Sequence, residues 1–74
     1  MDKYRVYAIM DEKEYGLCHV SYDDDRLDRF ELILNEDKST IYLSEEIANE
    51  AIDTHRRSRP DQKVDEYKTV TVLN

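Results

Sequence analysis

The chain of 74 residues contains one cysteine, one glycine and one proline, and it has no tryptophan. A single cysteine, Cys18, excludes an intrachain disulfide. A single glycine, Gly16, excludes a glycine-rich phosphate loop, and a single proline, Pro60, excludes a proline-rich linker. No apolar run is long enough for a membrane span or a signal peptide, so the sequence predicts a cytoplasmic protein.

Catalytic and cofactor motifs are missing as well. The sequence has no GxSxG, HExxH, CxxC, Walker or dinucleotide-binding motif, and neither histidine has a cysteine or another histidine at metal-ligand spacing. At this length we expect one domain, residues 1–74, which buries only about 60–65% of the surface that its unfolded chain exposes. A core that thin rarely encloses a substrate pocket. We therefore predict a protein that is not an enzyme and has no metal site and no cofactor.

Negative charge is the strongest compositional signal. The chain carries 18 acidic and 11 basic residues, a net charge of −7. Residues 1–54 hold 15 acids and 6 bases, whereas residues 55–74 hold 3 acids and 5 bases. An acidic body argues against non-specific binding to nucleic acid or to anionic membranes. Because a small core leaves stability marginal, a homodimer would be one way to bury more surface.

One segment has the pattern of an amphipathic helix, with apolar residues at helical spacing between positions 47 and 55. Ser44 is a favourable N-cap, and two glutamates follow it in the first turn. Pro60 disfavours helical geometry in the residue before it, so the helix should end near residue 57 or 58. The residues that we expect to lie buried against a sheet are Ile47, Ala51 and Ile52.

The other segments have the alternating, β-branched composition of strands. They are residues 3–10, 15–22, 28–35, 40–43 and 64–73. Apolar groups on both faces of the first segment indicate a central strand, and a crossover after the helix could place the last strand parallel to an earlier one. The predicted fold class is α+β: a two-layer, mainly antiparallel sheet of four to five strands with one helix packed on one face, in the order β-β-β-β-α-β.

Residues 28–35 are the ambiguous segment, because their apolar side chains fit either a helix or a strand. We favour a strand, since turn residues follow and residues 40–43 could then pair back as a hairpin. In that arrangement Phe30, Leu32 and Leu34 face the helix and Glu31 lies in water.

Two clusters resemble reactive or metal-binding groups, but each is explained better by an ordinary structural role. Cys18 and His19 place a thiol beside an imidazole, but neighbouring strand residues point to opposite faces, which favours a small buried cysteine and a half-exposed histidine. The run Asp23, Asp24, Asp25, with Asp28, lacks the glycine and glutamate of a calcium loop, which favours a solvated turn.

Two further groups are candidates for binding. A basic helix end, formed by Arg56, Arg57 and Arg59, could contact an anion. We favour the alternative that these cations compensate the negative end of the helix dipole and form ion pairs within the chain, since no aromatic residue lies among them. Tyr7 and Tyr22 could form an exposed aromatic surface on the face of the sheet away from the helix, although we favour packing within the sheet.

We therefore predict a small acidic, non-catalytic protein that acts by binding another protein. The alternatives are a DNA mimic that inhibits a nucleic-acid-binding protein, and a weak nucleic-acid binder that uses the basic helix end. The candidate partner-binding residues are Asp23, Asp24, Asp25, Asp28, Tyr7 and Tyr22, and the candidate anion-binding residues are Arg56, Arg57 and Arg59.

Overall fold

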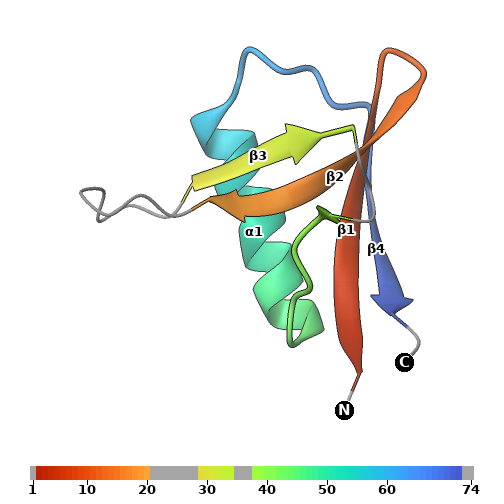
Figure 1. The fold of residues 1–74 in the computed structure, drawn as a ribbon. Helices are drawn as coiled ribbons and strands as arrows, with labels where there is room; N and C mark the ends of the chain where they lie inside the picture. The colour runs from red at the N-terminus through yellow and green to blue at the C-terminus, as the bar shows by residue number, and fades with distance from the viewer. Residues whose placement is uncertain (1, 21–28, 35–37, 73–74) are drawn as a thin grey trace.

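The computed structural model describes residues 2–20, 29–34 and 38–72, in which one helix lies against one face of a curved sheet (Figure 1). The sheet has the order β3-β2-β1-β4, and every neighbouring pair is antiparallel. The predicted two-layer α+β fold is confirmed, as is the central place of the first strand. The elements are β1 (Lys3–Met10), β2 (Lys13–Val20), β3 (Arg29–Ile33), α1 (Glu45–Ser58) and β4 (Glu66–Val72).

A two-residue turn joins β1 to β2. Met10 pairs with Lys13, and the residues between them, Asp11 and Glu12, have φ values of 53° and 64°. Such turns match the twist of the flanking strands, but their left-handed geometry is costly for any residue with a Cβ. The hairpin therefore forms despite its turn residues, which lack the usual Asn-Gly sequence.

We expect Glu12→Gly to raise the free energy of unfolding by about 1 kcal/mol, because glycine adopts a positive φ without steric cost. The measurement is urea denaturation at neutral pH. Glu14→Gly is the control, since residue 14 lies within β2 and glycine there should lower stability. A loss of stability in both variants would contradict the role assigned to the turn.

Gly16 marks the point at which β2 changes partner. It pairs with Tyr7 of β1 on one side and with Ile33 of β3 on the other. Beyond it β2 pairs with β3 alone, so the first half of β1 has no β2 partner. Tyr42 takes that place through an isolated bridge to Tyr4. The prediction that residues 40–43 form a strand paired with the preceding one is therefore wrong, because the run makes only an isolated bridge, and makes it to β1 at Tyr4.

The last strand begins where β1 ends. The backbone N–H of Asp65 donates to the carbonyl oxygen of Ile9 at 2.8 Å, and Glu66 is the ladder partner of Ile9. A strand that starts at this end of β1 runs antiparallel to it, so the parallel placement considered for the crossover is wrong. The predicted strand of residues 64–73 is shorter in the structure, with residue 73 outside the described part.

The helix begins as predicted. The hydroxyl oxygen of Ser44 accepts a hydrogen bond from the N–H of Ile47 at 3.1 Å, and the helix ends at Ser58. Ala51 and Ile52 are buried as predicted, but Ile47 is 46% exposed, which corrects the expectation for that residue. The face that meets the sheet carries Ala48, Ala51, Ile52 and His55, so Ile47 lies at its edge.

The core lies between α1 and the sheet. Phe30 and Leu32 of β3 pack against it as predicted, whereas Leu34 is 65% exposed, contrary to prediction, because β3 ends one residue earlier and its alternation does not continue. The buried cluster consists of Val6, Leu17, Tyr42, Ala48, Ala51 and Ile52.

Candidate partner-binding groove

Tyr42 anchors the segment between β3 and α1. Its backbone N–H donates to the carbonyl of Tyr4 at 2.7 Å and its carbonyl accepts from the N–H of Tyr4 at 2.8 Å. Its hydroxyl donates to the carbonyl oxygen of Leu17 at 3.0 Å, and the side chain is 4% exposed. Burial raises the pKa of Tyr42 well above its usual range, so the hydroxyl remains a donor. The backbone of Tyr42 therefore fixes this segment to β1, and its side chain fixes it to β2.

The residues on either side of Tyr42 point outward as a consequence. Neighbouring side chains of an extended segment alternate between faces, and an inward Tyr42 turns Ile41 and Leu43 to the surface. Ile41 is 42% exposed and Leu43 is 64% exposed. Together with Ile47 of α1 they line a single groove of about 330 Å³. The other lining residues are His19, Phe30, Thr40, Tyr42, Glu50, Ala51 and Thr54.

One end of the groove is aromatic. The His19 ring lies 5.2 Å from the Phe30 ring, and the Phe30 ring lies 6.4 Å from that of Tyr42. The backbone N–H of His19 donates to the hydroxyl of Thr40 at 2.7 Å, which joins the end of β2 to the groove wall. Cys18, next in sequence, is half-buried, and its thiol donates to the carbonyl of Lys38 at 3.5 Å. The thiol and the imidazole thus have different partners.

The wall formed by α1 carries one acid. Glu50 lines the groove, and the other acids of the helix are solvent-exposed. The first base of the helix is Arg56, beyond the last of these acids. A partner in the groove would therefore meet apolar side chains in its floor and the negative charge of Glu50 on the α1 side. The acids of α1 are Glu45, Glu46, Glu50 and Asp53.

Two arginines of the predicted basic cluster, Arg56 and Arg59, have partners within the molecule. The guanidinium of Arg59 contacts Glu31 at 3.1 Å and Asp61 at 3.3 Å, and the bond to Asp61 raises the pKa of Arg59 and lowers that of Asp61. Arg56 lies over the Tyr67 ring, 5.0 Å from its centroid. Arg57 is exposed in a shallow depression with Glu50, Asp53 and Thr54. Glu31, expected in water, serves as an ion-pair partner.

His55 joins the helix to the loop and to β4, and it is 0% exposed. Its Nδ1 lies 2.7 Å from the Tyr67 hydroxyl and its Nε2 lies 2.8 Å from Oε1 of Gln62. Because a carboxamide oxygen only accepts, we assign the proton to Nε2, which leaves Nδ1 to accept from Tyr67. Burial lowers the pKa of His55, and Arg59 lowers it further, against the opposing effects of Gln62, Glu31 and Asp61.

The other residues selected from the sequence do not line the groove. Tyr7 alternates with the buried residues of β1, so it lies half-buried on the face away from α1. The remaining candidates, Tyr22, Asp23, Asp24, Asp25 and Asp28, lie outside the described residues. The groove residues were missed because Ile47 was assigned to the core and Leu43 to a strand. The available signal was that Ile47 lies one position before the stripe at 48, 51, 52 and 55.

The chain matches no protein-family model, and neither a curated protein nor a solved structure matches it. Among residues 2–20, 29–34 and 38–72, no group of three or more His, Cys, Asp or Glu is placed to hold a metal ion. In the same part of the chain, the helix is too short and too polar to cross a membrane.

Proposed function

We propose that this domain binds another protein by taking apolar side chains of a basic segment into the groove between residues 41–43 and α1. The observation that carries the proposal is the exposure of Ile41, Leu43 and Ile47, by 42%, 64% and 46%, within one groove. Isolated exposed apolar residues are ordinary, but a contiguous group beside a hollow is typical of an interaction surface.

The charge of the groove supports a basic partner. Glu50 lines it, and the other acids of the same helix are solvent-exposed. The chain as a whole carries a net charge of −7, which disfavours an acidic partner and speeds encounter with a basic one. We expect the partner segment to present a few large apolar side chains for the floor and lysine or arginine for Glu50.

The other two functions have less support. Nucleic-acid binding through the helix end would require Arg59 to exchange Glu31 and Asp61 for phosphate. Mimicry of DNA relies on rows of carboxylates and gives no role to an apolar groove. A protein partner uses both the exposed apolar side chains and Glu50.

The test is selection from a random peptide library, with affinities measured by fluorescence anisotropy for the wild type and two matched variants. Leu43→Glu places a charge in the groove, and Leu34→Glu places one on an equally exposed leucine, 65% against 64%, outside it. We expect selected peptides to combine apolar and basic residues, and Leu43→Glu to weaken their binding by roughly tenfold or more. Leu34→Glu should bind as the wild type does.

Salt dependence tests Glu50 separately. Glu50→Gln should weaken binding modestly and flatten its dependence on ionic strength, because one acid no longer attracts the basic peptide. Equal losses in Leu43→Glu and Leu34→Glu, or selected peptides without basic residues, would contradict the proposed mode of binding. Chemical shift changes confined to residues far from the groove would contradict its location.

A further inference from the structure

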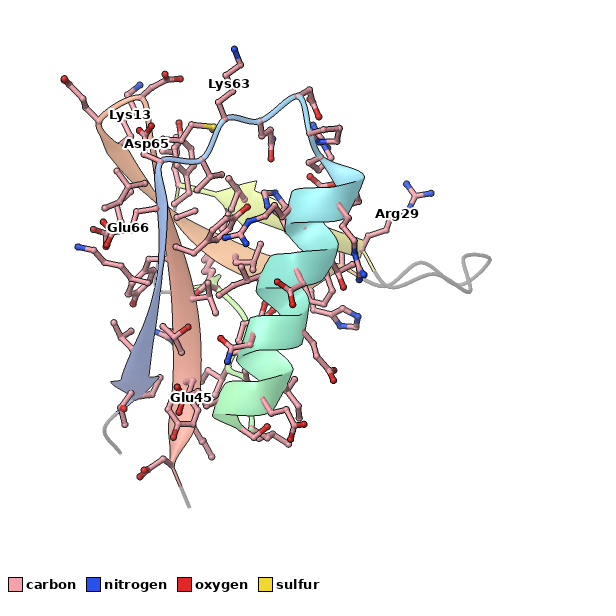
Figure 2. The ribbon with its side chains drawn as sticks, turned by 180° about the vertical axis from the view of Figure 1, so that it is seen from behind. Lys13, Arg29, Glu45, Lys63, Asp65 and Glu66 are labelled. Carbon is pink, nitrogen blue, oxygen red and sulfur yellow. The ribbon has the colours of Figure 1, made fainter. Side chains whose placement is uncertain are left out.

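β4 lies at an edge of the sheet, with β1 on one side of it. Within the described residues no element pairs with the other side of β4, and α1 packs on one face of the sheet (Figure 1). Figure 2 shows Glu66, at the start of β4, projecting away from α1. An edge strand of seven residues offers a row of backbone donors and acceptors to another strand.

The pairing of β1 shows which backbone groups of β4 face outward. Tyr4 exchanges both of its backbone hydrogen bonds with Tyr42, so these groups point away from β4. In an antiparallel ladder the N–H and C=O of one residue point the same way, and the direction alternates along the strand. The β4 partners of residues 4, 6 and 8 are Thr71, Thr69 and Tyr67. The N–H and C=O of these three residues therefore face the free edge.

We propose that β4 pairs antiparallel with β4 of a second copy of this chain, about a two-fold axis at Thr69. In this register Thr69 faces Thr69 of the second copy, and Tyr67 faces Thr71 of the second copy. Each such pair exchanges two backbone hydrogen bonds through groups that the fold leaves outward. Thr–Thr and aromatic–β-branched pairs are among the favourable cross-strand pairs. The two sheets become one continuous sheet, and the groove of each copy stays open.

Charge and length select this register and this edge. A two-fold axis at Lys68 would set two ammonium groups directly opposite each other, which is destabilising. Thr69 is the middle residue of Glu66–Val72, so its register pairs all seven residues, and any other centre pairs fewer. The edge strand also lies within residues 55–74, which carry 3 acids and 5 bases. Two copies that meet at this strand therefore avoid the electrostatic repulsion that would arise between their acidic residues 1–54. The inference does not depend on the groove.

Sedimentation equilibrium from micromolar to millimolar concentration tests association. We expect the wild type to shift from monomer to dimer, and Thr69→Pro to remain a monomer with an unchanged circular dichroism spectrum. Proline is tolerated at this position of an edge strand because the missing N–H is not bonded to β1. A wild type that stays monomeric, or a folded Thr69→Pro that still dimerises, would overturn the proposal.

Disulfide trapping tests the register and does not depend on a proline. In a background of Cys18→Ser, Thr69→Cys puts two thiols opposite each other within the Cα separation that a disulfide spans. Thr71→Cys is the matched control, since its counterpart lies four residues along the strand and beyond that range. We expect Thr69→Cys to cross-link at least about tenfold faster under mild oxidation. Equal rates, or no cross-linking in either variant, would refute the two-fold axis at Thr69.

Discussion

Replacing Ile52 by alanine should lower the free energy of unfolding by about 2–4 kcal/mol. The side chain is 9% exposed and lies in the cluster that α1 shares with the sheet. Its removal takes away apolar contacts and leaves a cavity that rigid strands cannot fill. For a domain this small, such a loss is a large part of the total stability, so a sizeable unfolded population should appear at 37 °C.

The matched control is Ile47→Ala, in the same helix and with the same change of side chain. Ile47 is 46% exposed, so we expect a loss below about 1 kcal/mol. Both variants are measured by urea denaturation, which also shows whether the dependence on denaturant is unchanged. Equal losses at the two positions would mean that α1 is rotated about its axis, so that Ile47 and Ile52 face the sheet equally.

The comparison of these two isoleucines also shows what the sequence alone could predict. Helical spacing placed both on one stripe, and the cap at Ser44 and the stop before Pro60 fixed the ends of the helix. Periodicity does not say where the centre of the stripe meets the sheet. That depends on the closest approach of the two layers, which is set by the small residues Ala48 and Ala51, 0% and 1% exposed. Ile47 is consequently left at the edge.

The groove could not be predicted because it depends on a long-range pairing. The composition of residues 40–43 indicated a strand, which was reasonable for a run with β-branched and aromatic side chains. The strand with which this run pairs depends on where β2 separates from β1, at Gly16. No local sequence pattern determines that position. Once Tyr42 is fixed to Tyr4, the outward direction of Leu43 follows from alternation alone.

Replacing His55 by alanine should cost about 3 kcal/mol, because two losses coincide. The side chain is fully buried, with its ring at 77° to that of Tyr67, so truncation leaves a cavity. It also leaves the Tyr67 hydroxyl and the Gln62 oxygen without the nitrogen partners that they have at 2.7 and 2.8 Å. His55→Phe, which fills the volume and restores neither bond, should recover only part of the loss in a thermal or urea denaturation experiment.

The same residue should make stability depend on pH in a predictable direction. Burial lowers the pKa of His55 in the folded state, so the unfolded chain takes up a proton first as the pH falls below about 6.5. The contribution of His55 to the free energy of unfolding is therefore fully present above that pH and declines as the pH falls. The decline ends once His55 is protonated in the folded state as well. The decline should be measured between about pH 8 and pH 5, above the range in which most carboxylates titrate.

Two variants assign that decline to His55. Of the charged neighbours that affect its pKa, Asp61 has a lowered pKa and Arg59 a raised one, so both keep their charges through this pH range. Tyr67 has a raised pKa and stays neutral. His55→Gln should therefore be less stable but nearly independent of pH, whereas His19→Gln, which changes the exposed histidine, should keep the wild-type slope. A slope that survives in His55→Gln would place the responsible proton on another group.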